Sequence, residues 1–149
     1  MLSRILNAKF LPTSTDVGLL LLRVGIGLIM FLKHGWEKIA VMSLTNNHFP
    51  DPIHIGMNAS WTIAVISDGI CSLLIVLGVA TRWVSLFAFC NIFVAWTFVH
   101  HYGFFGKTPN ANYGELIAQY LVTCVVLMVA GPGRYSVDAL LAHTSDAKA

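Results

Sequence analysis

The sequence predicts an all-α fold: a membrane-spanning four-helix bundle with short loops and both termini on the same side. The 149 residues are 56% hydrophobic and 11% charged, with a mean hydropathy of +0.73, whereas a soluble domain carries about a quarter charged residues. Four long apolar runs contain only two charged residues, Arg23 and Asp68. A bilayer imposes such segregation, because a charge at the centre of a spanning helix costs roughly 2.5 to 3.5 kcal/mol.

Three parts are predicted along the chain. Residues 1–15 form an N-terminal interfacial segment, because apolar residues at helical spacing alternate with basic ones before Pro12 breaks the run. Residues 16–133 form the membrane domain, whose four spans cover about 17–38, 61–80, 83–101 and 114–130. Residues 134–149 form a polar C-terminal tail. The spans leave no room for a separate soluble catalytic domain.

The distribution of basic residues predicts the orientation. Five lie on the side of both termini and three on the opposite side: Arg4, Lys9, Arg82, Arg134 and Lys148 against Lys33, Lys38 and Lys107. Cytoplasmic flanks are enriched in Lys and Arg, so both termini are expected on the cytoplasmic side of the membrane. A net charge of +2 offers no basic patch for nucleic acid. The expected partners are the lipid bilayer and either other subunits or further copies of this chain.

Ionisable and aromatic side chains from all four spans are predicted to meet near the non-cytoplasmic end. At 100° per residue, one face of the first span carries its ionisable groups except Lys33. The third span has an aromatic wall of Phe89, Phe93 and Trp96 that ends in His100, with Asn91 on the opposite side, facing another helix. A polar pocket is therefore expected. Its candidate ligand-binding or proton-transfer residues are Arg23, His34, Glu37, Lys38, Asp68, Trp96, His100 and Glu115, and no catalytic residue is assigned.

Simpler interpretations of the same residues stay open. Arg23 and Asp68 could form a structural ion pair, because an unpaired charge in hydrocarbon is costly. The histidines could be interfacial groups; as metal ligands, His34, His100 and His101 are weak candidates, and no metal is predicted. The three cysteines have no CxxC spacing and are expected to be small packing residues.

Several motifs resemble those of the DoxX family of small bacterial membrane proteins. They are Arg23-Val24-Gly25, His34-Gly35-Trp36-Glu37-Lys38, Asp68, Leu77-Gly78-Val79-Ala80-Thr81-Arg82, and Gly131-Pro132-Gly133-Arg134-Tyr135-Ser136-Val137-Asp138. The similarity extends from about Asp16 to Leu141. It implies a four-helix membrane fold, a loose association with sulfur or thiol redox chemistry, and roles for Arg23, Lys38, Asp68 and Arg134. This chain departs from the family pattern at two places. It has Asp68 where the family often has Glu, and Cys71-Ser72 where the family often has paired glycines.

Three functions follow from these expectations. The first is a membrane subunit of a redox complex that binds a quinone-like or small sulfur ligand in the outer pocket. If it takes part in catalysis, it acts with partners as a quinone-linked oxidoreductase subunit, because the sequence has no flavin, iron-sulfur or nucleotide motif. No intrinsic cofactor is evident from the sequence, and a quinone is the cofactor class considered. The alternatives are a non-enzymatic accessory or anchoring subunit and a small-solute carrier.

Overall fold

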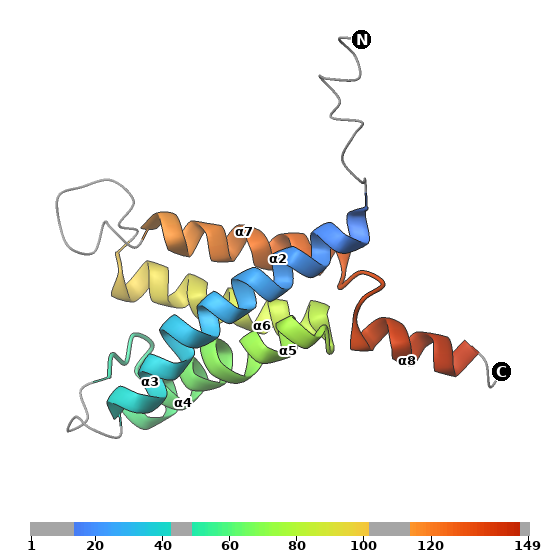
Figure 1. Ribbon diagram of the computed structural model, residues 1–149. Coiled ribbons are helices and arrows are strands. Elements are labelled where there is room, and N and C mark those ends of the chain that lie inside the picture. Colours follow the sequence, from blue (N-terminus) through green and yellow to red (C-terminus); the bar gives the residue numbers. More distant parts are fainter. Residues whose placement is uncertain (1–13, 43–48, 102–113, 147–149) are drawn as a thin grey trace, which may run out of the picture.

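The computed structural model describes residues 14–42, 49–101 and 114–146, and the regular structure in these ranges is helical throughout (Figure 1). Four rods form the bundle. The first consists of α2 (Thr15–Met30), the π-helical segment η1 (Phe31–Gly35) and α3 (Trp36–Met42). The second consists of α4 (Met57–Val65), η2 (Ile66–Cys71) and α5 (Ser72–Leu77). The third is α6 (Thr81–Val94) with η3 (Ala95–Val99), and the fourth is α7 (Gly114–Ala130). A further helix, α8 (Val137–Asp146), follows the bundle.

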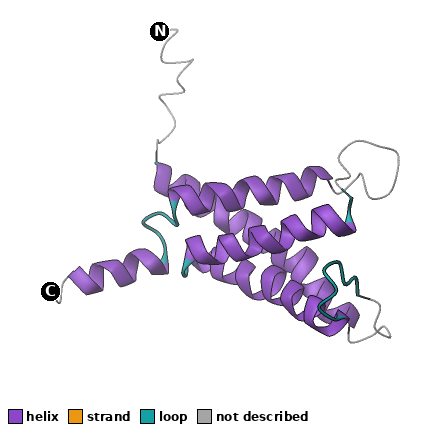
Figure 2. Ribbon diagram, turned by 180° about the vertical axis from the view of Figure 1, so that it is seen from behind, coloured by secondary structure: helices purple, strands orange, loops and turns teal. Residues whose placement is uncertain are grey.

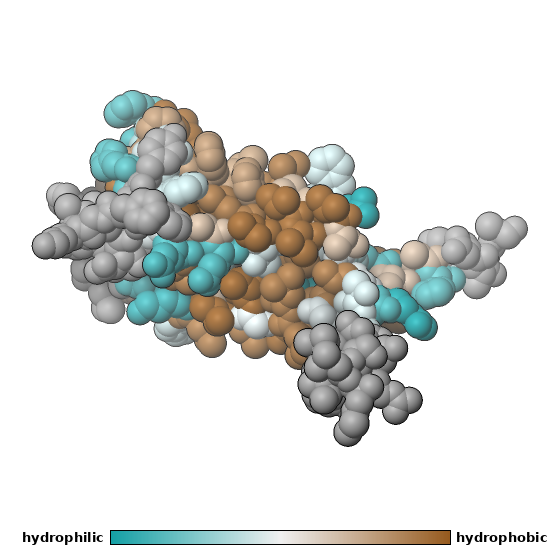
Figure 3. Space-filling model, turned by 90° about the horizontal axis from the view of Figure 1, so that it is seen from above, coloured by the Kyte–Doolittle hydropathy of each residue, from teal (hydrophilic) through white to brown (hydrophobic). Residues whose placement is uncertain are grey.

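Three continuous helices in the described ranges are long and apolar enough to cross a membrane: Thr15–Ala40, Met57–Leu77 and Thr81–Val99. The fourth, α7, is equally apolar and has 17 residues, a length of about 26 Å. Figure 3 shows the same segregation on the surface, with apolar residues across the middle of the bundle and hydrophilic residues toward its two ends. The predicted all-α membrane bundle is confirmed.

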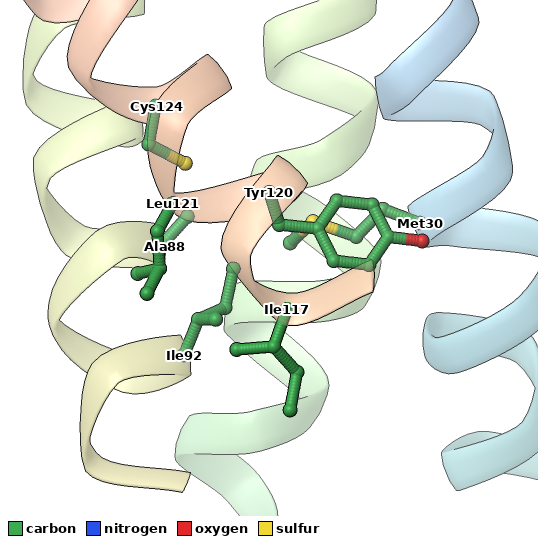
Figure 4. Close-up of a cluster of buried hydrophobic side chains, with 7 residues drawn as sticks. All are labelled: Met30, Ala88, Ile92, Ile117, Tyr120, Leu121 and Cys124. Atoms are coloured by element: carbon green, nitrogen blue, oxygen red, sulfur yellow. The ribbon is translucent and has the colours of Figure 1, made fainter. Parts of the chain in front are cut away.

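A small apolar core joins α7 to α2 and α6 (Figure 4). Its buried members are Met30, Ala88, Ile92, Ile117, Tyr120, Leu121 and Cys124. Many other large apolar side chains are exposed, among them Leu21 and Val129. Apolar side chains on the outside of a bundle suit acyl chains as solvent, so the small core is typical of a protein embedded in lipid.

Close backbone contact fixes α2 against the second rod. A Cβ at Gly27 would lie 2.9 Å from the carbonyl oxygen of Ser72 and 2.7 Å from Cγ2 of Val76. Such contacts form at membrane helix interfaces where small residues let the backbones approach. Further along the first rod, η1 contacts η2 and α3 contacts α4.

The beginning of α2 and the end of α7 lie at one end of the bundle, which we call the inner end. The opposite end, with α3 and the beginning of α4, is the outer end (Figures 1 and 2). Asp16 and Asp138 organise the inner end. Asp16 Oδ1 accepts a hydrogen bond from Arg134 N at 2.9 Å. Asp138 accepts from the backbone N–H groups of Ala80 and Thr81 at 2.7 and 2.9 Å, which caps the N-terminus of α6.

The segment after α7 is therefore a docked part of the fold. Its Asp138 N–H donates to the carbonyl oxygen of Gly78 at 2.9 Å, and Gly78 ends α5 in the left-handed conformation with φ of 72°. The sequence analysis predicted only a polar tail here, because the capping contacts of Asp138 are long-range. Asp138 lies in the first turn of α8, and the rest of this helix extends away from the bundle (Figure 1). The expected interfacial segment at 1–15 lies almost wholly outside the described residues.

Candidate functional site

An ion pair between Lys38 and Asp68 is the centre of the outer-end site. Lys38 Nζ lies 2.5 Å from Asp68 Oδ2, with side-chain exposures of 23% and 11%. The two residues come from the first and second rods, as the sequence predicts for side chains that turn inward. A carboxylate in a spanning helix needs such a partner because an uncompensated charge is strongly unfavourable there.

Local helix irregularity brings the two rods together at this pair. Asp68 lies in η2, and the hydroxyl of Ser72 donates to the carbonyl oxygens of both Asp68 and Gly69 at 2.7 Å. Gly35, which ends η1, faces this backbone: a Cβ there would lie 2.5 Å from the carbonyl oxygen of Asp68. Only a glycine allows this approach. π-Helical turns are frequent at functional sites.

Two further hydrogen bonds connect the pair to its surroundings. Asn91 Nδ2 on α6 donates to Asp68 Oδ1 over a long 3.5 Å, so Asn91 does contact another helix, as predicted. Trp61 Nε1 on α4 donates to the carbonyl oxygen of Lys38 at 3.2 Å. The ion pair thus joins the first three rods near the outer end.

A cavity of about 260 Å³ opens beside the ion pair, between α4 and the α6–η3 rod. Its walls are mostly aliphatic, and the chain from Phe49 to Ile55 covers part of it. The polar side chains on its lining are those of Lys38, Ser60, Asp68, Asn91 and His100. An apolar space with a few convergent polar groups is the usual form of a small-molecule site.

Asp51 organises the segment that covers the cavity. Its carboxylate accepts hydrogen bonds from Ile55 N at 3.1 Å, Gly56 N at 2.8 Å and Ser60 Oγ at 2.7 Å. The bond from the Ser60 hydroxyl is the main reason why the pKa of Asp51 is lowered. Asp51 therefore fixes the covering segment to the first turn of α4 and is a positioning residue.

His100 lies on the cavity lining directly after η3. Partial burial lowers the pKa of His100, and the charges of Lys38 and His101 lower it further. A neutral imidazole has one donor and one acceptor nitrogen. The neighbouring His101 is exposed, with φ of 48°.

His34 lies within the bundle but is not on the cavity lining. Its ring meets the ring of Tyr120 edge to face, with centroids 5.6 Å apart, and Figure 4 shows the Tyr120 hydroxyl directed toward α2. Among the described residues, neither His34 Nε2 nor Tyr120 Oη has a hydrogen-bond partner, although both atoms are buried. This pair is a second polar spot in the interior, on the α7 side of the first rod.

Arg23 lies far from the predicted pocket. The hypothesis that it pairs with Asp68 is wrong, because Asp68 pairs with Lys38. Arg23 is 1% exposed at the inner end, where its guanidinium contacts Gly78 and a Cβ on that glycine would overlap Nη1. The negative charge of Asp138 acts on this guanidinium electrostatically. The physical reason is depth: Arg23 belongs to the inner half of its helix and Asp68 to the outer half.

Three other candidates also lie off the cavity. Glu37 and Glu115 are exposed, and Trp96 packs against the apolar core. Phe89 and Phe93 stack on one another at 6.0 Å between centroids, but the predicted aromatic wall does not line the cavity. The face that does so carries Asn91, Val94 and Ala95.

The described ranges contain no group of three His, Cys, Asp or Glu side chains placed to hold a metal ion. His34, which contacts Tyr120, and His100, on the cavity, have different surroundings. The three cysteines are free thiols; Cys71 and Cys124 are buried and Cys90 is exposed.

Sequence reasoning missed Tyr120 and the cover of the cavity. Tyr120 lies in an apolar run, where nothing local distinguishes a tyrosine that meets a histidine from one that packs in a core. The cover had a signal in Pro50-Asp51-Pro52, because Asp before Pro favours a turn. The role of Asp138 could be anticipated only from its place in a family motif.

A helical membrane bundle with a polar cluster between its rods defines the class of this protein: a small polytopic membrane protein with an internal polar site. The chain belongs to the DoxX family, whose model matches residues 18–101. It is similar to an uncharacterized protein of Haemophilus influenzae (strain ATCC 51907 / DSM 11121 / KW20 / Rd), with 28% identity over 138 residues that cover 91% of this chain and 90% of the relative. No solved structure matches the chain.

Proposed function

We propose that this protein is a membrane subunit of a redox complex and that its outer-end cavity binds the head group of a quinone-class molecule. The observation that carries the proposal is the cavity beside the Lys38–Asp68 pair. Its volume of about 260 Å³ is just below the range of drug-sized sites, roughly 300 to 1,000 Å³. It suits a single substituted ring.

The polar lining matches the needs of a ring with carbonyl oxygens. On the cavity lining, Lys38 and Asn91 carry N–H donors and His100 carries an imidazole. The aliphatic walls from α4 and η3 suit the ring faces. A quinone would supply redox chemistry, whereas the residues of this chain would orient it and exchange protons with it. Electrons would come from a partner subunit.

The proposed setting is a bacterial inner membrane, with both termini in the cytoplasm and the cavity toward the opposite face. The positions of Arg82 and Arg134 at the inner end support this orientation, because basic residues collect at cytoplasmic flanks.

The proposal is tested by identifying the small molecules that stay bound to the protein when it is extracted from its native membrane. After mild detergent extraction and purification, mass spectrometry of the bound small molecules should find a quinone at close to one per chain. The variant A95F, which fills the cavity, should lose it; the control L86F, on the exposed surface of α6, should retain it. Equal quinone content in both variants, or none in the wild type, would contradict the proposal.

One observation favours a non-enzymatic accessory subunit as a second candidate. Both oxygens of the Asp68 carboxylate have partners within the chain, Lys38 and Asn91, which is the arrangement expected if the polar groups only join the helices. In that case the same partner protein would co-purify with the wild type in every preparation, and no quinone would be found. The variant A95F would retain that partner.

A further inference from the structure

The inner end of the bundle carries two arginines that no carboxylate in the described chain neutralises. Arg82 and Arg134 are exposed and form no ion pair with a described acidic residue. The two acidic groups that organise this end, Asp16 and Asp138, use their oxygens to accept backbone N–H groups and the Thr81 hydroxyl. The positive charge here is therefore available to a partner outside the chain.

The Arg82 guanidinium is held in place by the end of α7. Its Nη2 donates to the carbonyl oxygen of Val129 at 3.5 Å, and both Nε and Nη2 lie 3.6 Å from the position of a Cβ at Gly131. Gly131 has φ of 77° and ends α7. The bond to Val129 occupies one of the five guanidinium N–H groups, so others can reach a ligand.

Arg134 must be near Arg82 because only three residues separate it from Gly131. An extended chain rises at most about 3.6 Å per residue, so their Cα atoms lie within about 11 Å. Arg134 N is fixed by Asp16, which anchors the backbone at this position. The Arg82 guanidinium, which reaches from α6 to Gly131, thus lies close to the segment that carries Arg134.

Two aromatic side chains mark the depth of this segment. Trp83 is 77% exposed at the start of α6, and Tyr135 is 58% exposed just after Arg134. Exposed Trp and Tyr at the ends of spanning helices lie at the level of the lipid head groups. Arginines at that depth face head-group phosphates, to which a guanidinium can bind in a bidentate manner.

We infer that Arg82 and Arg134 form a binding site for the head group of an anionic phospholipid at the inner end of the bundle. The chemistry is a phosphate held by guanidinium N–H groups, with Trp83 and Tyr135 beside it at the interface. This inference is independent of any ligand in the outer cavity.

Thermal unfolding of the full-length protein in mixed micelles tests the site, with phosphatidylglycerol as the anionic probe and phosphatidylcholine as the neutral one. Phosphatidylglycerol should raise the unfolding temperature of the wild type, and phosphatidylcholine should not. In R82Q/R134Q the phosphatidylglycerol needed for half the effect should rise about thirtyfold, since each basic side chain near an anionic surface contributes roughly fivefold. The charge-retaining R82K/R134K should keep most of the response even if R82Q/R134Q folds poorly.

A matched control and a second anion complete the test. K33Q removes an exposed charge from the outer half of the first rod and should leave the lipid response unchanged. Inorganic phosphate at the same charge concentration should have little effect. The inference is overturned if R82Q/R134Q responds like the wild type, if K33Q weakens the response equally, or if phosphate replaces the lipid.

Discussion

Gly35 on η1 and Asp68 on η2 lie in backbone contact: a Cβ on Gly35 would be 2.5 Å from the carbonyl oxygen of Asp68 and 2.8 Å from Cα of Gly69. The contact involves main-chain atoms on the η2 side, which cannot move aside as a flexible side chain could. It brings Lys38, three residues further along the first rod, within reach of the Asp68 carboxylate.

The variant G35A should therefore be destabilised. Overpacking of a tight interface costs about 1 to 3 kcal/mol, and a clash with backbone falls at the upper end. Denaturant unfolding in detergent, followed by circular dichroism, measures the effect. The control is G25A on the same rod, where no atom lies within 4 Å of the added Cβ. G25A should be neutral or slightly stabilising, because Ala favours helix more than Gly; equal stability of the two variants would contradict the contact.

The Lys38–Asp68 ion pair predicts that replacing Lys38 lowers the stability of the folded protein. K38M leaves the Asp68 carboxylate without its charged partner, and we expect a loss of about 1 to 3 kcal/mol, less than for a fully buried pair because both side chains are partly exposed. K38M/D68N should recover part of the loss, because it removes the charge that K38M leaves unpaired. K33M, an exposed lysine on η1, is the control. If K38M and K33M unfold at the same denaturant concentration, the pair contributes nothing to stability.

At the inner end, D138A should destabilise the folded protein more than its position near the C-terminus suggests. The substitution removes two backbone caps of α6 and the hydroxyl bond from Thr81, and it removes the negative charge that acts on the buried Arg23. We expect a loss of about 2 to 4 kcal/mol. E115A, which removes an exposed acid from the start of α7, should change stability by less than about 0.5 kcal/mol. Similar unfolding curves for D138A and E115A would show that the closing segment does not stabilise the bundle.

Acidification should weaken the fold through His100. Its pKa is lowered in the folded protein, mainly by burial, so the unfolded chain takes up a proton first as pH falls. The stabilising contribution is fully present above the ordinary histidine pKa of about 6.5 and is lost as pH falls from there toward the folded-state pKa. Unfolding between pH 7.5 and 5 should show this loss in the wild type and a weaker one in H100Q. H143Q, on exposed α8, should behave like the wild type; an unchanged pH profile in H100Q would contradict the assignment.

Local chemistry and composition predict the fold well but the site only in part. Arg23 and Asp68 are the sole charges in four apolar runs, and this is sufficient to predict a membrane bundle. A constant 100° per residue then places Arg23, His34, Glu37 and Lys38 on one face. The π-helical segment η1 interrupts that regularity between Phe31 and Gly35, so Glu37 faces outward while Lys38 meets Asp68.

Depth and long-range packing account for the remaining differences. Gly35 contacts the backbone of Asp68, whereas Arg23, twelve residues earlier and therefore about 18 Å closer to the inner end, contacts Gly78. That offset favours Lys38 over Arg23 as the partner of Asp68. The cover of the cavity from Phe49 to Ile55 and the docking of Asp138 on Ala80 and Thr81 depend on contacts between distant parts of the chain. Pro50-Asp51-Pro52 indicates a turn, but no local pattern specifies which distant residues that turn or Asp138 contacts.

The central claim, that the outer cavity binds a quinone ring through the residues around Lys38, is tested most directly by titration with a short-tailed ubiquinone. Tryptophan quenching reports binding, because Trp61 is hydrogen-bonded to the Lys38 carbonyl oxygen, and W61F should lose most of the signal. We predict saturable binding to the wild type and to K33M. In K38M and N91L the affinity should fall about tenfold or more, because each variant removes a partly buried hydrogen-bond donor from the cavity lining. Absence of saturable binding, or equal affinity in K33M, K38M and N91L, would contradict the claim.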